Sequence, residues 1–521
     1  MKAGTGTILL AVMLAGFAAA VPARGEDDPW YRVTKLFTSR TLSHSRDKTW
    51  KPGKGPAMEV SGLDVLPDGR VAVAIRKGEI WLIDNAEADD PTELALSRFA
   101  TGLHEPLGLL YRDGDLYVAQ RTELTKLRDT DSDGVADEYL TAASGWNVSG
   151  NYHEYIFGPK EDGNGNLWLT TNLGIGKGAD NSKPWRGWGL MLDKQGKLHP
   201  MAAGMRSPSG LGANRAGDMF FTDQQGNWVP TNSLHHLRRG AFYGHPEGLP
   251  PQTRGDSPLR LKAKVKPHGS YPEAVRAIPE LVPPAVWFPY MKMGRSATDI
   301  VLDDTGGKFG PFAGQLFVGD FTHSQISRVF LERVGGEYQG ACFPFRSGFP
   351  AAVVRLALSR KGQLFVGMTN RGWNSRGDAS YGLHRLAWTG KTPFEIKEMR
   401  ARPDGFSLRF TEAVDPASAG DVSSYGMVSY TYPYSGAYGG DEILTRKLTI
   451  ESATVTDHGL SVRLVISPLR EMFVHELKVS GVRSQSGEKP RHPVAYYTLN
   501  RIPGRSTSAD GDRRSAPPEE R

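Results

Sequence analysis

The sequence has 521 residues, with 63 basic against 57 acidic side chains and a net charge of +6. So small an excess, interspersed along the chain, forms no basic stripe and argues against a nucleic-acid-binding protein. Abundant glycine (61) and proline (35) favour a turn-rich fold, and the single cysteine, Cys342, excludes an internal disulfide.

The N-terminus has the layout of a secretory signal peptide. Lys2 is followed by an apolar run from Ile8 to Ala20 and then by small residues before Pro22. The run is too short to span a bilayer comfortably, so we expect a cleaved signal over residues 1–25. No later stretch is long and apolar enough to cross a membrane, so no transmembrane segment is expected after signal removal. Export without disulfides fits a bacterial periplasmic or secreted protein.

One pattern recurs six times between residues 30 and 390: a short apolar strand, a glycine turn, and further apolar strands. The turn glycines are Gly69, Gly114, Gly165, Gly217, Gly314 and Gly362. They lie 45, 51, 52, 97 and 48 residues apart, and the long interval holds a proline-rich insertion at roughly 240–290. Several strands in each such unit are typical of propeller blades, so we expect an all-β, six-bladed propeller over residues 30–390. The alternative is a set of unrelated hairpins.

From about residue 391 the pattern changes to alternating apolar and polar residues, as in "GFSLRFT" and "LSVRLVI". Such alternation is typical of half-buried antiparallel strands. It predicts a small C-terminal β-sandwich over residues 391–503. Residues 504–521 are rich in Ser, Asp, Arg, Pro and Glu, and we expect a disordered tail there.

A propeller would bring together the residues that precede the innermost strand of each repeat. In chain order these are Glu59, Glu105, Tyr152 with His153, Arg206 with Ser207, Arg295 with Ser296, and the apolar pair Phe349 and Pro350. One mouth of the channel is therefore expected to hold two carboxylates, one imidazole and two guanidiniums, with no cation from the sixth repeat. The cluster predicts a ligand site, or alternatively a salt-bridged plug that holds the blades together.

The chemistry of the cluster suits oxidation of an alcohol. An imidazole accepts a proton near neutral pH and a guanidinium does not lose one, so we assign His153 as general base and Arg206 as stabiliser of negative charge. Hydride then needs an acceptor. No GxGxxG motif stands in a strand–helix context, so nicotinamide and flavin are not supported.

Over roughly residues 50–390 the sequence resembles the soluble glucose/sorbosone dehydrogenases, six-bladed propellers that use pyrroloquinoline quinone (PQQ) with calcium. "HEYIFGPKEDGNGNLWLTT" is similar to the segment of their catalytic histidine and matches His153. "MRSPSGLGANRAGDMFFTDQQGN" is similar to that of their catalytic arginine and matches Arg206. The "QQGN" loop looks like the family's loop beside calcium and cofactor.

The resemblance and the mouth cluster together imply a set of cofactor-binding residues: Glu105, Tyr152, Ser207, Gln225, Gly226, Arg295 and Thr322. The chain also departs from the family pattern. Thr322 and the apolar "FPAAVV" stand where the family has basic residues for the PQQ carboxylates, with His323 and Arg355 only as neighbours. Tyr152 replaces an acidic residue.

A closer resemblance, which includes the C-terminal "YYTLN" and "IP", is to exported membrane-bound-dehydrogenase propellers of planctomycete-type bacteria. Many of those carry a fused c-type cytochrome. This chain has no CxxCH motif, so the resemblance implies a separate cytochrome or a soluble carrier as electron acceptor.

"RDTDSDGVADEY" is the most specific local motif. Alternating carboxylates, a glycine turn and a free carbonyl are the hard oxygen ligands that wrap calcium. The expected ligands are Asp129, Asp131, Asp133, the carbonyl of Val135, and Asp137 or Glu138. Leu140 occupies the twelfth position, so the loop is no regular EF-hand. The alternative is an acidic surface turn.

These observations predict an exported oxidoreductase that oxidises a sugar or polyol with a PQQ-like quinone and calcium. The alternative is a non-catalytic propeller that binds a carbohydrate or a protein. A lactonase-like hydrolase is a third possibility, but it would need more mouth ligands than Glu59 and Glu105. Trp185 and Trp188 are either a sugar-stacking rim or packing between blades.

Overall fold

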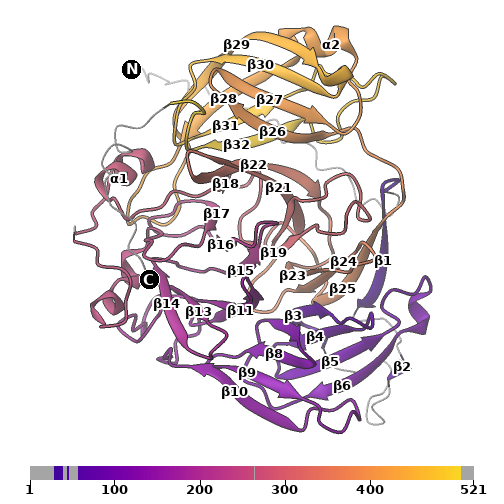
Figure 1. Ribbon diagram of the computed structural model, residues 1–521, viewed down its shortest axis with the longest axis vertical. Helices are drawn as coiled ribbons and strands as arrows, with labels where there is room; N and C mark the ends of the chain where they lie inside the picture. The colour runs from indigo at the N-terminus through magenta and orange to yellow at the C-terminus, as the bar shows by residue number, and fades with distance from the viewer. Residues whose placement is uncertain (1–27, 39–43, 46–56, 263, 506–521) are drawn as a thin grey trace, which may run out of the picture.

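The computed structural model describes residues 28–38, 44–45, 57–262 and 264–505 (Figure 1). The expected signal peptide and residues 506–521 of the expected tail lie outside the described residues. Strands predominate within this part of the chain, and none of its helices is long and apolar enough to cross a membrane.

The six predicted glycine turns share one backbone conformation. Each joins the first strand of a repeat to the second, and all six glycines have φ between 79° and 93°. Residues with a Cβ adopt this conformation only at a cost, which explains why glycine recurs at this point of every repeat.

The strands form short sheets in chain order, antiparallel except for the parallel pairing of β2 with β6. The first sheet holds β3 (Val60–Val65), β4 (Val71–Ile75), β5 (Glu79–Asp84), β6 (Ala95–Ala100) and the short β2 (His44–Ser45). The second holds β7 (Leu109–Arg112), β8 (Asp115–Ala119), β9 (Glu123–Arg128) and β10 (Glu138–Ser144). The third holds β11 (Ile156–Glu161), β12 (Leu167–Thr171), β13 (Trp188–Leu192) and β14 (Leu198–Ala203). The fourth holds β15 (Gly210–Ala213), β16 (Met219–Asp223), β17 (Asn232–His236) and β18 (Val286–Phe288).

Two further sets of strands complete the propeller. β19 (Ala297–Leu302), β20 (Leu316–Asp320), β21 (Gln325–Val334) and β22 (Glu337–Arg346) are the first four strands of an eleven-stranded sheet. The last sheet holds β23 (Val353–Leu358), β24 (Gln363–Thr369) and β25 (Tyr381–Trp388), and β1 (Tyr31–Thr38) adds to its outer edge.

The inner strands form a closed ring (Figure 1). Strands β3, β7, β11, β15, β19 and β23 contact one another in this order, and β23 returns to β3. The predicted all-β propeller is therefore confirmed.

Arg355 of β23 fills the centre of this ring. Its guanidinium donates to the carbonyl oxygens of Ser61 (2.8 Å), Leu107 (2.7 Å) and Ser209 (3.3 Å), which belong to three other inner-strand segments. A fourth bond goes to the carbonyl of Val354 (2.7 Å). Every nitrogen of this buried guanidinium is thus used within the ring, and the side chain is not available to a ligand at the mouth.

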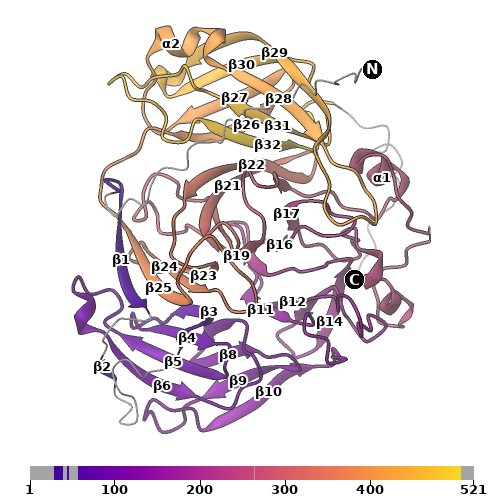
Figure 2. The ribbon, with the colours of Figure 1, turned by 180° about the vertical axis from the view of Figure 1, so that it is seen from behind.

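The proline-rich insertion lies between β17 and β18. It contains the 3₁₀ turns Pro246–Gly248 and Pro250–Thr253 and the helix α1 (Tyr271–Ala277). Ser270 caps α1 by accepting a hydrogen bond from the backbone N–H of Glu273. The insertion packs at one side of the propeller, beside β17 (Figures 1 and 2).

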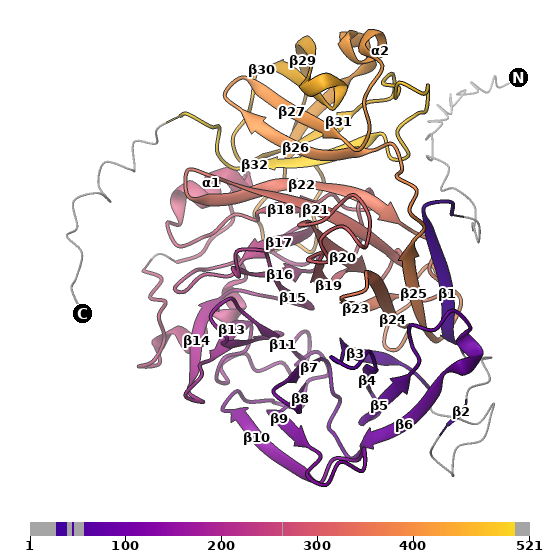
Figure 3. The same ribbon diagram turned by 45° about the vertical axis from the view of Figure 1, so that its right-hand side comes forward.

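The C-terminal strands are stacked on the outer edge of the fifth set (Figure 3). They are β26 (Ile396–Arg402), β27 (Gly405–Phe410), β28 (Gly426–Thr431), β29 (Ile443–Thr456), β30 (Ser461–Ser467), β31 (Phe473–Lys478) and β32 (Val494–Leu499), with the short helix α2 (Pro416–Gly420). β32 pairs with β22, and Phe330 and Phe343 of the propeller join the C-terminal hydrophobic core. The division into a propeller and a separate sandwich stays a prediction.

Candidate functional site

Two kinds of segment meet on one face of the propeller. Because successive strands of each sheet are antiparallel, the residues that precede an inner strand lie beside the turn from the second strand to the third. We call this edge of the ring the mouth face. It holds every residue of the predicted mouth cluster, together with turn residues that the sequence alignment did not include.

His153 lies on the mouth face just before β11 and is half-buried. Its backbone N–H donates to Oδ1 of Asn151 (3.0 Å), and its ring meets the Tyr152 ring edge-on with centroids 5.4 Å apart. Among the described residues neither ring nitrogen has a hydrogen-bond partner. Burial, reinforced by the guanidiniums of Arg206 and Arg121, holds the pKa of His153 below its ordinary value. The imidazole is therefore neutral at neutral pH and has a free nitrogen to accept a proton.

Arg206 is held by the end of strand β16. Asp223 accepts hydrogen bonds from the backbone N–H groups of Arg206 (2.8 Å) and Ser207 (2.7 Å). The guanidinium donates to the carbonyl of Gln225 (3.3 Å) and lies against Gly226, where a Cβ would be 2.2 Å from its Cδ. Arginine in this position requires glycine at 226, which accounts for the "QQGN" turn.

Asp223 is completely buried, and burial raises its pKa to about 6 although backbone N–H groups stabilise its charged form. His245 lies beside it, with Nε2 3.9 Å from the carboxylate, too far for a hydrogen bond. Burial, reinforced by the charge of Arg206, lowers the pKa of His245 well below its ordinary value. The pair is thus a positioning group beneath Arg206 and does not reach the solvent side of the mouth.

Asp320 performs the same task at the fifth inner strand. It ends β20 and accepts from the backbone N–H groups of Arg295 (2.8 Å), Ser296 (2.8 Å) and His323 (2.7 Å). The Ser296 hydroxyl lies 3.0 Å from that of Thr322. Arg206 with Ser207 and Arg295 with Ser296 therefore have one structural basis, a buried aspartate at the end of the second strand.

Glu105 is occupied by ion pairs. Its carboxylate pairs with Arg76 (3.3 Å) and with Arg121, and Arg121 also donates to the carbonyls of Asn151 (3.1 Å) and Tyr152 (2.7 Å). Burial alone would raise the pKa of Glu105, but the two guanidiniums outweigh it and hold the pKa below its ordinary value. Glu105 thus fixes the segment that carries His153.

Tyr152 is half exposed and lies over this ion pair. The guanidinium carbon of Arg76 is 5.3 Å from the Tyr152 ring centre and 4.9 Å from that of Tyr155, whose hydroxyl accepts from Arg76 (2.6 Å). Tyr152 is therefore part of an arginine–aromatic stack.

The expectation that the last repeat supplies no cation is wrong. The turn from β24 to β25 carries Arg371, which pairs with Glu59 (2.8 Å), and Arg376, whose backbone N–H donates to the carbonyl of Thr322 (2.8 Å). Burial, reinforced by Arg376 and Arg295, lowers the pKa of His323 to about 4. Both guanidiniums therefore lie near His323 on the mouth face.

The sequence analysis missed Arg76, Arg121, Arg371 and Arg376 because it compared only the residues before the inner strands. These arginines stand directly after the second strand or in the turn that follows it, as in "AIRKG", "AQRTE" and "MTNRG". Arg76 and Arg121 each lie seven residues after a turn glycine, so the same repeat could have found these two. Arg371 and Arg376 lie nine and fourteen residues after Gly362 and do not share that spacing.

The mouth face holds three guanidiniums that are not in ion pairs with the described residues. No carboxylate of the described residues lies within ion-pair distance of Arg206, Arg295 or Arg376, whereas Glu59 and Glu105 are paired with other arginines. This donor set fits a ligand with several carboxylates, such as PQQ. The two carboxylates that the sequence suggested for a lactonase-type metal, Glu59 and Glu105, are both already in ion pairs.

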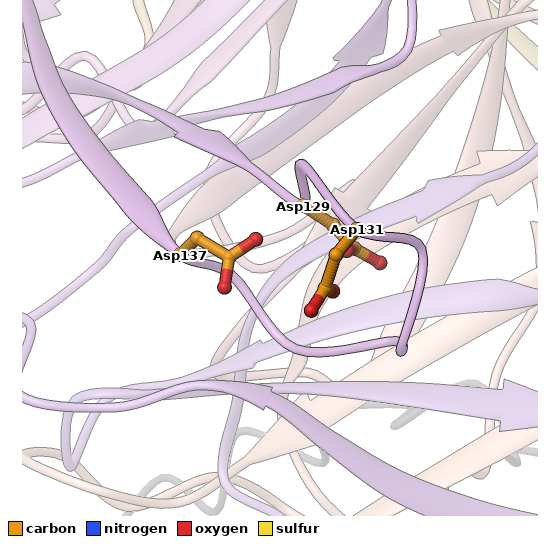
Figure 4. A group of neighbouring side chains, drawn as sticks. All are labelled: Asp129, Asp131 and Asp137. Carbon is orange, nitrogen blue, oxygen red and sulfur yellow. The ribbon is translucent and has the colours of Figure 1, made fainter.

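The acidic loop lies between β9 and β10, at the opposite edge of the second sheet from Arg121. Asp129, Asp131 and Asp137 each place a carboxylate oxygen within 4.8 Å of the others (Figure 4). Asp133 instead accepts from the N–H of Val135 (2.8 Å). Glu138 pairs with Arg128 (3.3 Å). The three clustered oxygens could hold a cation, and their place on the outer edge makes any such role structural.

Trp185 and Trp188 are both buried and pack edge to face with centroids 4.9 Å apart. They therefore belong to the packing between strands and do not form a sugar-stacking rim.

Comparison with known families identifies the chain at the level of a domain. Residues 77–341, which are 265 of the 521 residues, match the family described as "Domain of unknown function (DUF7133)". The chain belongs to the DUF7133 family. A comparison of this DUF7133 protein with curated protein sequences finds no match.

Solved structures similar to this DUF7133 protein include three described as sugar dehydrogenases. The apo-form of the soluble aldose sugar dehydrogenase from Escherichia coli is 12% identical, covers 68% of this chain and 99% of its own, and has a TM-score of 0.46. The PQQ-bound form of the aldose sugar dehydrogenase from Streptomyces coelicolor is 15% identical, covers 68% and 98%, and has a TM-score of 0.44. The holo form of the pyranose dehydrogenase PQQ domain from Coprinopsis cinerea is 12% identical, covers 68% and 95%, and has a TM-score of 0.44.

Proposed function

We propose that this protein is an exported oxidoreductase that oxidises a hydroxyl group of a sugar or polyol with a PQQ-like quinone. The observation that carries the proposal is the partly exposed imidazole of His153 on the mouth face, whose pKa is lowered by burial and by the nearby Arg206. For this proposal we count β19–β22 as one blade, which gives the propeller six.

In the proposed reaction, His153 accepts the proton of the substrate hydroxyl at a ring nitrogen, and Arg206 stabilises the negative charge that develops on that oxygen. The quinone, when bound, would accept the hydride that leaves the carbon bearing this hydroxyl. The buried Asp223 keeps the Arg206 backbone in place, so the guanidinium is preorganised at the moment of proton transfer.

The cofactor would be held by the guanidiniums that have no carboxylate partner. Arg295 and Arg376 would pair with its carboxylates, and Arg206 would lie beside its reacting edge. Ser207, Gln225, Gly226, Thr322 and Tyr152 would line the same site. Desolvating several carboxylates is expensive without such cations, and this is why the arginines of the last two repeats matter.

The remaining roles follow from the same proposal. Asp129, Asp131 and Asp137 bind calcium and stabilise the β9–β10 turn. The signal peptide directs the protein to the periplasm or the exterior of a bacterium of planctomycete type. Electrons leave to a separate cytochrome or a soluble carrier.

A non-catalytic carbohydrate-binding propeller is the second candidate. It is favoured by one observation, the exposed aromatic rings of Tyr152, Trp373 and Tyr438. Exposed rings hold sugars without any need for a base or a cofactor.

The two candidates are separated by loading the purified protein with PQQ and calcium. The dehydrogenase predicts stoichiometric cofactor binding and dye-linked oxidation of sugars, with at least a ~100-fold loss of turnover in His153→Ala. The control is Tyr139→Ala, which changes an exposed tyrosine on the outer strand β10. Absence of PQQ binding, or full activity in His153→Ala, would exclude the proposed mechanism.

A further inference from the structure

The segment between β28 and β29, residues 432–442, leaves the C-terminal strands and lies on the fourth sheet of the propeller (Figure 2). Buried tyrosines anchor its base. The carbonyls of Tyr432 and Tyr434 accept from the backbone N–H groups of Tyr271 (2.7 Å) and His268 (2.8 Å). The Tyr434 hydroxyl donates to the carbonyl of Gly244 (2.7 Å). The base of the segment is therefore firmly fixed to the insertion.

The tip of the segment pairs with the "QQGN" turn, against which the Arg206 guanidinium packs. The backbone N–H of Trp228 donates to the carbonyl of Ser435 (2.7 Å), and that of Gly439 donates to the carbonyl of Gly226 (2.9 Å). Asn227 adds a side-chain bond to the carbonyl of Gly436 (2.7 Å). The C-terminal part of the chain thus completes the mouth face beside Arg206.

Tyr438 is the residue that this tip presents. Its side chain is 62% exposed, and the guanidinium carbon of Arg206 lies 5.1 Å from its ring centre. Arg206 is thereby held between the Tyr438 ring and the backbone of Gly226. The backbone bonds of the tip fix the ring at the rim without burying it, so most of the ring is open to a ligand.

A second exposed ring lies against the other member of the His153–Arg206 pair, because Tyr438 contacts Arg206 and Tyr152 contacts His153. Tyr152 is 50% exposed and contacts the His153 ring, and its hydroxyl lies next to Gly372, which precedes the exposed Trp373. Among the described residues, four aromatic side chains are strongly exposed: Tyr139, Tyr152, Trp373 and Tyr438. Three of the four are on the mouth face, where large exposed apolar side chains indicate a binding surface.

We infer that Tyr438 and Tyr152 are stacking platforms for pyranose rings on either side of the reacting unit, and that the substrate is an oligosaccharide. The apolar C–H face of a pyranose packs on an aromatic ring, while the tyrosine hydroxyl stays in water. Two exposed rings, one against His153 and one against Arg206, fit linked sugar units better than a single monosaccharide. Tyr438 is then a specificity-determining residue contributed from outside the propeller. The inference rests on the proposed function for the identity of the reacting unit.

The test measures binding to the cofactor-free protein, so that it does not depend on turnover. Titration calorimetry compares hexasaccharides of glucose, xylose, mannose, galactose and galacturonic acid with the corresponding monosaccharides. We expect at least one hexasaccharide to bind about 10-fold more tightly than its monomer, and this gain to disappear in Tyr438→Ala and Tyr152→Ala. Tyr438→Phe keeps the ring and should bind as the wild type does. Tyr139→Ala, which lies far from the mouth face, is the matched control.

Two results would overturn the inference: no hexasaccharide binds more tightly than its monomer, or Tyr438→Ala binds as the wild type does. Thermal unfolding of each variant shows that it is folded before it is scored. Failure of this inference is distinguishable from failure of the proposed function. Oxidation of a hexasaccharide and of its monomer by the wild type with equal kcat/KM would keep the dehydrogenase and remove the subsite, whereas tight hexasaccharide binding without any oxidation would do the reverse.

Discussion

Substitution of Arg355 should measurably lower the thermal stability of the protein. The four hydrogen bonds of Arg355 tie carbonyl oxygens of four chain segments to one buried guanidinium at the centre of the ring. In Arg355→Met the apolar side chain fills much of the same volume but leaves those carbonyls without donors. It also leaves the buried Asp299 without the cation that interacts with it. Removing one member of such a buried charged group costs about 3–5 kcal/mol.

The assay is thermal unfolding at neutral pH. A folded chain of this length has an unfolding entropy of about 1 kcal/mol/K, so the Tm of Arg355→Met should fall by about 3–5 °C. Arg355→Lys keeps the charge but has a single compact head group, so it should lose nearly as much. The control is Arg32→Met, which removes an ion pair between side chains 62% and 88% exposed and should change Tm by less than about 1 °C. A Tm for Arg355→Met within about 1 °C of wild type would refute this account of the centre of the ring.

Three further predictions concern the mouth face and the acidic loop. Arg206→Met should shift the acid limb of the pH–rate profile upward, because loss of the guanidinium favours the protonated imidazole and raises the pKa of His153; an unmoved limb would mean that another group titrates. Asp223→Asn presents an amide N–H to one of the backbone donors and should lower the free energy of unfolding by about 1–3 kcal/mol at pH 7. Asp320→Asn is the paired variant at the neighbouring repeat. Because burial raises the pKa of Asp223 to about 6, wild type should lose stability relative to Asp223→Asn as pH rises from about 4 through 6, and a constant difference in unfolding free energy would contradict this. Millimolar calcium should raise the Tm of the wild type but not that of Asp129→Ala. At a calcium concentration 100 times the Kd, the wild type should gain about 2.7 kcal/mol of unfolding free energy. An equal response in both proteins would place the ion elsewhere.

The sequence was sufficient to predict the ring and the convergence of His153 with Arg206. Glycine is favoured where the backbone takes positive φ, so the turn glycines show the period of the repeats, and the position before each inner strand follows from that period. The same logic reaches Arg76 and Arg121, which each lie seven residues after a turn glycine. It does not reach Arg371 and Arg376, because the turn between β24 and β25 is longer and places them nine and fourteen residues after Gly362.

Other parts of the site lie beyond any periodic argument. Nothing in the alternation of the C-terminal strands says where the long segment between β28 and β29 ends, so the contact of Tyr438 with Arg206 depends on tertiary packing. The ion pairs of Glu105 with Arg76 and Arg121 also depend on tertiary packing. The nearest cation in the folded chain decides whether this carboxylate is free to bind a cofactor or is held in an ion pair. Burial of Trp185 and Trp188 likewise follows from the neighbouring strands and not from their own segment.

The pairing of β1 with β25 has a consequence for how the chain reaches its folded state. Tyr31–Thr38 is made first, yet its partner strand Tyr381–Trp388 is made some 350 residues later. The outer edge of β25 therefore has no hydrogen-bonding partner until the two ends of the propeller meet. β1 likewise has no partner strand until β25 has been synthesised. A chain that ends before Tyr381 lacks the partner of β1 and cannot close the circle. An N-terminal fusion that restrained Tyr31–Thr38 would be expected to hinder closure more than one at the C-terminus.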